Sequence, residues 1–167
     1  MGSEMCIRDR LIGFSNESYP RIGRVMRCNG TGRKIGDIEL DEEGQRLYGY
    51  PLYITENKMN GDIVVYDDWK NALVVVDRSG RHRFNYKGIL FRPRGVCTDV
   101  LGRILVSHTG YDDDSEEVCC ISLLDRDGRF LTRLLTQPRD DDGFNSLCVD
   151  DNNNIYVAFD DKIKVFK

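Results

Sequence analysis

The sequence predicts an all-β protein built from a repeated unit of short strands, and three observations support this. A short run of β-forming residues follows a Gly or Asn turn in three places, at 61–65, 102–106 and 153–157. Another strand ends in a Ser-Gly turn at 74–81 and in an Asp-Gly turn at 122–129, where Gly supplies the positive φ that a hairpin requires. Apolar residues with the 3.6-residue period of a helix extend over no useful length.

The repeated unit is about 40–50 residues long, because the copies that begin at residues 61, 102 and 153 are 41 and 51 residues apart. A first strand precedes each copy, and a fourth strand follows each Gly turn. The first strands are expected at 51–56, 95–99 and 146–150, and the fourth strands at 83–87 and 130–135. Four antiparallel strands at this period are typical of one blade of a β-propeller.

The predicted architecture is therefore an incomplete propeller of about three four-stranded blades. Residues 11–50 are expected to form a partial first blade, with its third strand at 24–28 and its fourth at 34–40. The remaining divisions are a second blade at 51–88, a third blade with an acidic insertion at 89–142, and a partial fourth blade at 143–167. Residues 1–10, MGSEMCIRDR, look like translated sequencing-adaptor sequence and are interpreted as a non-native leader.

The composition is globular and excludes several classes of protein. Hydrophobic residues make up 40% and charged residues 31% of the 167 positions, and the net charge of −4 lacks the basic excess of most nucleic-acid binders. No apolar stretch reaches the length of a membrane span, and no signal-peptide core is present at the start. The six cysteines include no Cys-x-x-Cys pair. We therefore expect a cytoplasmic protein with reduced thiols and no cofactor.

Three stretches carry a resemblance to a known family. They are PLYITENKMNGDIVVYDDWKNALVVVDRSGRHRFNYKG, PRGVCTDVLGRILVSHTG and its echo SLCVDDNNNIYVAFDD. Over roughly residues 20–167 the chain resembles the NHL-repeat propeller of tripartite-motif (TRIM) NHL proteins, in particular the expanded group of molluscs.

The resemblance implies a binding function and not an enzyme. Members of the family carry a RING domain, B-boxes and a coiled coil before the propeller, and the RING confers E3 ubiquitin ligase activity. Their propellers bind protein partners or, in some members, RNA. The zinc-ligand pattern of a RING does not occur in this sequence, so ligase activity would belong to a parent protein.

Ligands of propellers usually bind on the face formed by the loops that join fourth to first strands and second to third strands. Those loops are expected at 67–71, 87–94, 108–117, 138–145 and 160–162. Trp69, the only tryptophan, lies in the first of them and is a candidate contact residue, although it could instead pack over its own blade.

Basic residues are expected on the same face, together with aromatic ones. They are Lys87, Arg92, Arg94 and Arg139, with Phe91 and Tyr111 available for stacking. Such a group could contact a protein or the phosphates of RNA. The carboxylates of 112–114 and 116–117 would repel phosphate, so a protein partner is favoured over RNA, and neither DNA nor a membrane is expected.

Other site chemistry has weaker support. Asp112 and Asp114 have the first spacing of a calcium loop, but no Gly follows them, which favours a solvated insertion. A metal-dependent propeller hydrolase or lyase would need converging ligands, and the first strands offer Glu56, Asp99 and Asp150 without a His. No catalytic or metal-binding residue is therefore assigned.

The remaining polar and sulfur-containing residues are assigned structural roles. Asp77 and Asp125 are expected to cap turns, and Cys97 and Cys148 to be buried thiols. The side chains of Cys119 and Cys120 are expected on opposite faces of a strand, and His82 and His108 are expected to be isolated. An open arc of blades would also leave an apolar face at each end, which predicts self-association.

Overall fold

The structure is a computed structural model that describes residues 10–16, 21–88, 91–112, 114–138 and 143–167. Within these ranges the regular secondary structure consists entirely of β-strands, fourteen in number, and the predicted all-β class is confirmed. No helix in the described ranges is long and apolar enough to cross a membrane.

The strands form four antiparallel sheets, each with its strands in sequence order. The first sheet contains β1 (Arg10–Ser15), β2 (Gly23–Cys28) and β3 (Lys34–Ile38). The second contains β4 (Pro51–Glu56), β5 (Ile63–Asp67), β6 (Ala72–Val76) and β7 (His82–Tyr86). The third contains β8 (Phe91–Thr98), β9 (Ile104–Tyr111), β10 (Glu117–Leu124) and β11 (Phe130–Pro138). The fourth contains β12 (Ser146–Val149), β13 (Ile155–Ala158) and β14 (Ile163–Phe166).

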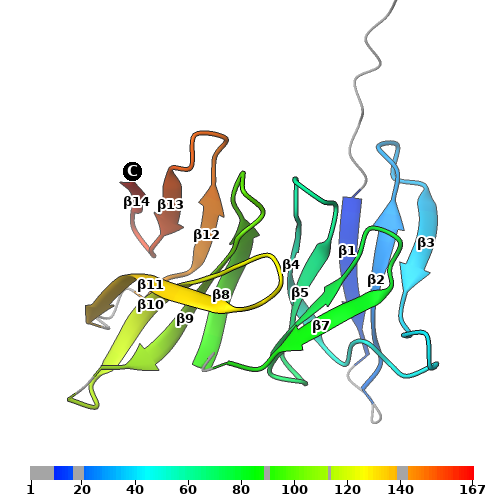
Figure 1. The fold of residues 1–167 in the computed structure, drawn as a ribbon, viewed down its shortest axis with the longest axis horizontal. Helices are drawn as coiled ribbons and strands as arrows, with labels where there is room; N and C mark the ends of the chain where they lie inside the picture. The colour runs from blue at the N-terminus through cyan, green and yellow to red at the C-terminus, as the bar shows by residue number, and fades with distance from the viewer. Residues whose placement is uncertain (1–9, 17–20, 89–90, 113, 139–142) are drawn as a thin grey trace, which may run out of the picture.

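The sheets stand in a row in the order of the chain, from the blue sheet to the red sheet of Figure 1. Neighbouring sheets touch through β1 and β4, β4 and β8, and β8 and β12. The middle strands β5 and β6 are buried along their whole length, because they have a strand on either side and a sheet against each face. This explains why residues 63–66 and 72–76 are continuous apolar runs without alternation.

Three apolar clusters fill the spaces between successive sheets. Between the first and second sheets lie Val25, Ile38, Leu47, Tyr48, Ile63, Val65, Val74 and Val76. Between the second and third lie Val64, Tyr66, Leu73, Val75, Val96, Ile104, Val106 and Leu124. Between the third and fourth lie Cys97, Leu105, Cys119, Ile121, Leu123, Phe144, Leu147, Val157 and Phe159. Alternate residues of one strand thus pack on opposite neighbouring sheets, as the two-residue period of a strand requires.

One type of turn recurs seven times in the described part of the chain. At Asp77, for example, the side-chain Oδ1 accepts the backbone N–H groups of Ser79 at 2.8 Å and Arg81 at 3.0 Å, and Gly80 has a φ of +94°. The same arrangement begins at Asn29, Asp41, Asp99, Asp112, Asp125 and Asp150. The predicted capping roles of Asp77 and Asp125 are confirmed, and local side-chain acceptors explain why Asp recurs at these positions.

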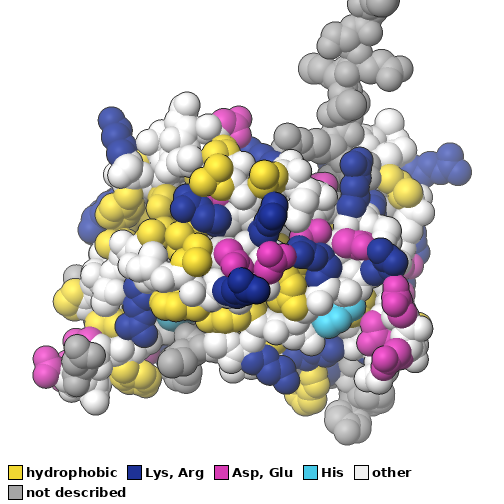
Figure 2. Space-filling view, in the orientation of Figure 1, with side chains coloured by type: hydrophobic (Ala, Val, Ile, Leu, Met, Phe, Trp, Pro, Cys, Tyr) yellow, Lys and Arg dark blue, Asp and Glu magenta, His cyan; other side chains and the backbone are white. Residues whose placement is uncertain are grey.

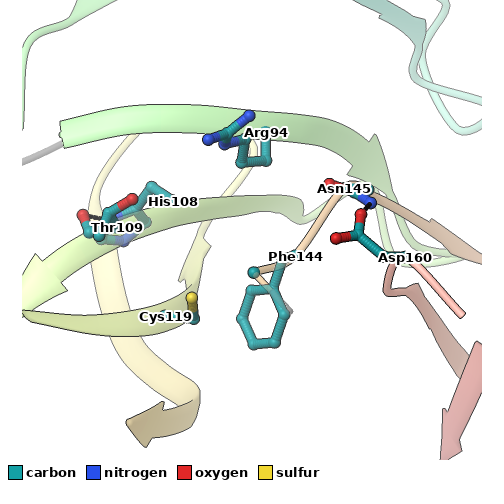
Figure 3. Close-up of a pocket in the computed structure, with 8 residues that line it drawn as sticks. Arg94, His108, Thr109, Cys119, Phe144, Asn145 and Asp160 are labelled. Carbon is teal, nitrogen blue, oxygen red and sulfur yellow. Dashed lines mark hydrogen bonds between the residues drawn. The ribbon is translucent and has the colours of Figure 1, made fainter. Parts of the chain in front are cut away.

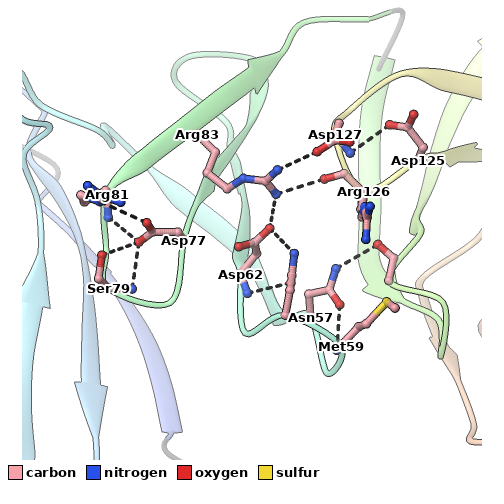
Figure 4. A network of polar contacts seen from close by, with 12 residues as sticks. Asn57, Met59, Asp62, Asp77, Ser79, Arg81, Arg83, Asp125, Arg126 and Asp127 are labelled. Carbon is pink, nitrogen blue, oxygen red and sulfur yellow. Dashed lines mark hydrogen bonds and ion pairs between the residues drawn. The ribbon is translucent and has the colours of Figure 1, made fainter.

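Polar contacts tie neighbouring sheets together near these turns, as Figure 4 shows. Arg83 on β7 forms an ion pair with Asp62, and its Nη2 donates to Oδ1 of Asp127 in the third sheet at 2.7 Å. The side-chain amide of Asn57 donates to the carbonyl oxygen of Gly102 at 2.9 Å. The turns at 57–62 and 99–103 therefore lie against each other at the same end of the second and third sheets.

The structure corrects the expected boundaries in three places. The first sheet has a strand, β1, before the two that were expected, and it begins at Arg10, a residue assigned to the leader. The leader's other residues lie outside the described ranges. Half of the loop expected at 108–117 is strand, because β9 continues to Tyr111 and β10 begins at Glu117 in an unbroken register. Arg92 and Arg94 likewise lie on β8 and not in a loop.

Candidate functional site

The ends of the sheets opposite the contacting turns at 57–62 and 99–103 carry most of the residues predicted to bind a partner. Trp69 follows β5, Lys87 follows β7, Arg92 and Arg94 lie at the start of β8, and Tyr111 ends β9. Because the second and third sheets touch at one set of turns, their opposite ends also share one side of the molecule. We call this side the candidate face. Arg139 lies outside the described residues.

Trp69 belongs to a small cluster with Arg21 and Tyr50, which we call the Trp69 cluster. The guanidinium carbon of Arg21 lies 5.1 Å from the ring centroid of Trp69 and 5.5 Å from that of Tyr50, within the range of a cation–π contact. Trp69 also packs on Gly49, where an added Cβ would lie 2.6 Å from Cδ1. Even so, 56% of the tryptophan surface is exposed. The Trp69 side chain therefore packs against Arg21 and Gly49 and still offers an accessible surface.

Asp67, a fully buried residue at the end of β5, holds the backbone beneath this cluster. Its Oδ2 accepts the backbone N–H groups of Gly49 at 2.8 Å and Tyr50 at 2.9 Å, and its Oδ1 accepts that of Lys70 at 2.9 Å. One carboxylate thus joins the segment before β4 to the turn that contains Trp69. Charge-assisted hydrogen bonds of this kind are the stronger ones in proteins, so the cluster rests on a rigid base.

The predicted basic residues do not form one patch. Arg92 is 4.0 Å from the Glu117 carboxylate, and Glu117 is the register partner of the half-exposed Tyr111. The structure thus brings Arg92 and Tyr111 to one place, together with the carboxylate of Glu117. Lys87 is exposed just beyond the end of β7.

Arg94 lines a pocket between the third and fourth sheets, shown in Figure 3. The pocket has a volume of about 240 Å³. Its lining consists of Arg94, His108, Thr109, Cys119, Gly143, Phe144, Asn145 and Asp160. Asn145 and Asp160 hydrogen-bond through their side chains, and Phe144 meets Phe159 edge to face, with ring centroids 5.4 Å apart. A cation and a carboxylate beside amide and hydroxyl groups suit a polar peptide group better than a polyanion.

His108 was expected to be isolated, but its imidazole forms a hydrogen-bonded pair with Ser122. Nδ1 lies 2.7 Å from the carbonyl oxygen of Thr109, so Nδ1 carries the proton and Nε2 accepts the Ser122 hydroxyl at 2.8 Å. Burial lowers the pKa of His108, and the charge of Arg133 contributes to the same shift. The two side chains lie on neighbouring strands 14 residues apart in sequence, so no local motif could have revealed them. With both residues at least 96% buried, the pair acts as a satisfied polar contact in the core.

The acidic insertion is a capped turn. Oδ1 of Asp112 accepts the backbone N–H groups of Asp114 at 3.1 Å and Glu116 at 2.8 Å, and Ser115 takes the positive φ that Gly or Asn has in the other turns. The described residues contain no group of three or more His, Cys, Asp or Glu side chains placed to hold a metal ion.

The cysteines differ from expectation at one position. Cys97 is buried, as predicted, and burial raises the pKa of its thiol to about 12. Cys148, predicted to be buried, is exposed, because no described segment covers its face of the fourth sheet. Cys119 and Cys120 both lie buried in β10, and Cys119 packs toward the fourth sheet. The five described cysteines are free thiols.

Comparison of the chain with protein-family models and with curated proteins finds no match to either.

Proposed function

We propose that this chain is a section of an NHL-type β-propeller from a protein of the tripartite-motif kind, and that it recognises a protein partner in the cytoplasm. Four meandering sheets packed side by side through their first strands support the propeller, and the repeat in the sequence supports the same architecture. The recognised protein would be a substrate or scaffold for a RING ligase domain located elsewhere in the parent protein. Five free thiols suit a reducing compartment.

The observation that carries the binding function is the candidate face. It combines an exposed tryptophan on a rigid base with an arginine-lined pocket, both at the same end of neighbouring sheets. Tryptophan and arginine are the residue types that contribute most to protein interfaces. The carboxylates of Glu117 and Asp160 lie among the basic residues, which favours a peptide of mixed charge over RNA.

Selection of peptides from a displayed library against the purified chain tests this proposal. We expect the selected peptides to lose about tenfold or more in affinity to the Trp69→Ala and Arg94→Ala variants. Leu101→Ala is the matched control, because Leu101 is exposed in the turn at 99–103, at the opposite end of the sheets.

Two results would contradict the proposal. One is a set of peptides whose affinity is unchanged in both variants. The other is salt-sensitive binding of single-stranded RNA that survives in Trp69→Ala but is lost in Arg94→Ala, which would indicate the RNA-binding alternative.

A further inference from the structure

Another pocket opens between the second and third sheets, beside their outer strands β7 and β11. Its volume is about 400 Å³, the size of many small-molecule sites. Figure 2 shows exposed hydrophobic side chains beside Lys and Arg side chains over β11. Both walls are four-stranded sheets in the middle of the row, so the pocket belongs to a contact between sheets and not to an end of the row. The described residues that line it are Tyr86, Gly88, His108, Ser122, Phe130 and Arg133.

The pocket forms where the apolar packing between these two sheets stops. Ile104 and Val106 on β9 belong to the apolar cluster, and His108 is the next residue of β9 that faces the same way. On β10, Leu124 belongs to that cluster, and Ser122 is the next residue on its face. The strands β5, β6 and β7 have five residues each, whereas β9 and β10 have eight. The longer third sheet therefore presents His108 and Ser122 beyond the apolar residues that the second sheet covers.

Arg133 supplies a cation to this pocket. It is the register partner of Ser122, so both side chains lie on the face of the third sheet that points toward the second. Burial is the main cause of the lowered pKa of His108, and the charge of Arg133 contributes, which places the guanidinium near the imidazole. No described carboxylate forms an ion pair with Arg133, in contrast to Arg83 and Arg103. An exposed arginine that lines a largely apolar pocket without an acidic partner is suited to bind an anion.

The His108–Ser122 pair has no donor left for a ligand, and the other walls are aromatic. The Ser122 hydroxyl donates to Nε2 of His108, and Nδ1 of His108 donates to a backbone carbonyl oxygen. Burial raises the pKa of Tyr86, so its hydroxyl stays protonated and can donate a hydrogen bond. Gly88 packs on that hydroxyl, since an added Cβ would overlap it. The described lining thus combines a guanidinium and a phenol with the rings of Tyr86 and Phe130, and it carries no negative charge.

We propose that this pocket binds a small apolar carboxylate, such as an aryl carboxylate, with the carboxylate on Arg133 and the apolar body between Tyr86 and Phe130. A guanidinium can donate two parallel N–H groups to one carboxylate, which fixes the orientation of the ligand. Transfer of the apolar body from water to the aromatic walls adds to the affinity. The site is independent of the proposed partner recognition, because only His108 of its described lining also lines the pocket of Arg94.

Titration of the ¹⁵N-labelled chain with 2-naphthoate, followed by NMR, tests the proposal. 2-Naphthamide has nearly the same shape without the charge and is the matched probe. We expect 2-naphthoate to bind saturably and 2-naphthamide to bind at least about tenfold more weakly, because the charge-assisted hydrogen bonds are lost. The backbone amide signals of Gly88 and Ser122 should shift, whereas that of Gly36, on β3 of the first sheet, should not.

Two variants separate the polar and the apolar contributions. Arg133→Met should weaken 2-naphthoate about tenfold and leave 2-naphthamide unchanged, whereas Phe130→Ala should weaken both probes. The controls are Arg129→Met, which lies just before β11 and outside the pocket, and Leu134→Ala, which lines a separate hollow of the third sheet. All four side chains are exposed, so the variants should fold, and circular dichroism checks this.

The proposal is overturned if 2-naphthoate shows no saturable binding, if the two probes bind equally, or if Arg133→Met keeps the difference between them. An acetylated Phe-Phe dipeptide with a free carboxyl end, compared with its amide, distinguishes a small carboxylate from the end of a polypeptide. Binding of the dipeptide acid without binding of 2-naphthoate would assign the pocket to a protein C-terminus and would also overturn the proposal.

Discussion

Arg83 on β7 and Asp127 in the turn after β10 lie 44 residues apart in the sequence, and Nη2 of Arg83 donates to Oδ1 of Asp127 at 2.7 Å. The same guanidinium pairs with Asp62, whose side chain is only 6% exposed. Arg83 therefore neutralises a buried carboxylate of its own sheet and attaches that sheet to the next one.

Replacement of Arg83 by Met should destabilise the protein because it leaves Asp62 buried without a cation. We expect the free energy of unfolding to fall by about 2 kcal/mol. This is less than the ~3–5 kcal/mol for breaking a fully buried pair, because the Arg83 side chain is 28% exposed. Urea unfolding measures the loss. Arg81→Met is the control, since Arg81 is 68% exposed and its ion pairs should contribute under ~0.5 kcal/mol. Equal stability of the two variants would show that the Arg83 contacts do not hold the second and third sheets together.

Gly49→Ala should displace the indole of Trp69, because the new Cβ would lie 2.6 Å from Cδ1. We expect stability to fall by about 1–3 kcal/mol and the fluorescence of this single tryptophan to become more accessible to acrylamide. Gly36→Ala is the control, because nothing lies within 4 Å of a Cβ added there. Unchanged quenching in Gly49→Ala would mean that the ring does not rest on Gly49.

The hydrogen bond from the Ser79 hydroxyl, together with those from the backbone N–H groups of the turn and the Arg81 side chain, lowers the pKa of Asp77 to about 2. A carboxylate whose pKa is lowered in the folded state stabilises that state at pH values above the ordinary pKa of 3.8. This contribution is lost as the pH falls toward 2. Carboxyl ¹³C chemical shifts of Asp77 should titrate with a midpoint near 2, and Ser79→Ala should raise that midpoint. A midpoint near 3.8 in the wild-type protein would contradict the capped turn.

Burial, together with the charge of Arg133, lowers the pKa of His108 below its ordinary value of 6.5. The unfolded chain then binds more protons than the folded one at mildly acidic pH, so stability should be constant above pH ~6.5 and decrease below it. Urea midpoints between pH 7.5 and 5.5 measure this decrease.

His108→Gln should remove most of the acid sensitivity, whereas His82→Gln, at an exposed position on β7, should retain it. An identical pH dependence of the wild-type protein and His108→Gln would rule out a buried neutral imidazole.

The strands were largely predictable from the sequence because their apolar residues and turns repeat. The strands expected at 24–28 and 61–65 correspond to β2 and β5, and the Asp-Gly turn at 125–129 is where expected. β1 was not predicted, because its first residue belongs to the expected leader and its short alternation contains Gly13. The polar end of β9 was interpreted as a loop, because pairing with β10 and the contact of His108 with Ser122 are cross-strand features.

The candidate site was less predictable than the strands. Trp69, Lys87 and Arg94 lie at the expected end of the sheets, but nothing local in the sequence indicates that Asp67 binds Gly49 or that Arg21 stacks on Trp69. These contacts join segments 18 or more residues apart. Their geometry depends on the order in which whole sheets pack, which local propensity does not specify.

The row of sheets is the central claim, because the candidate face depends on it. Nζ of Lys58, in the turn between β4 and β5, lies 2.7 Å from Oδ1 of Asp151, in the turn between β12 and β13, across 93 residues of sequence. A carbodiimide couples a lysine to a carboxylate without a spacer, so treatment of dilute protein followed by mass spectrometry tests this proximity directly. The arrangement predicts a Lys58–Asp151 amide within the monomer band, and it predicts that Lys58→Arg removes that amide. Coupling of Lys58 only to residues near it in sequence, with Asp151 coupled to other lysines, would contradict the row of sheets.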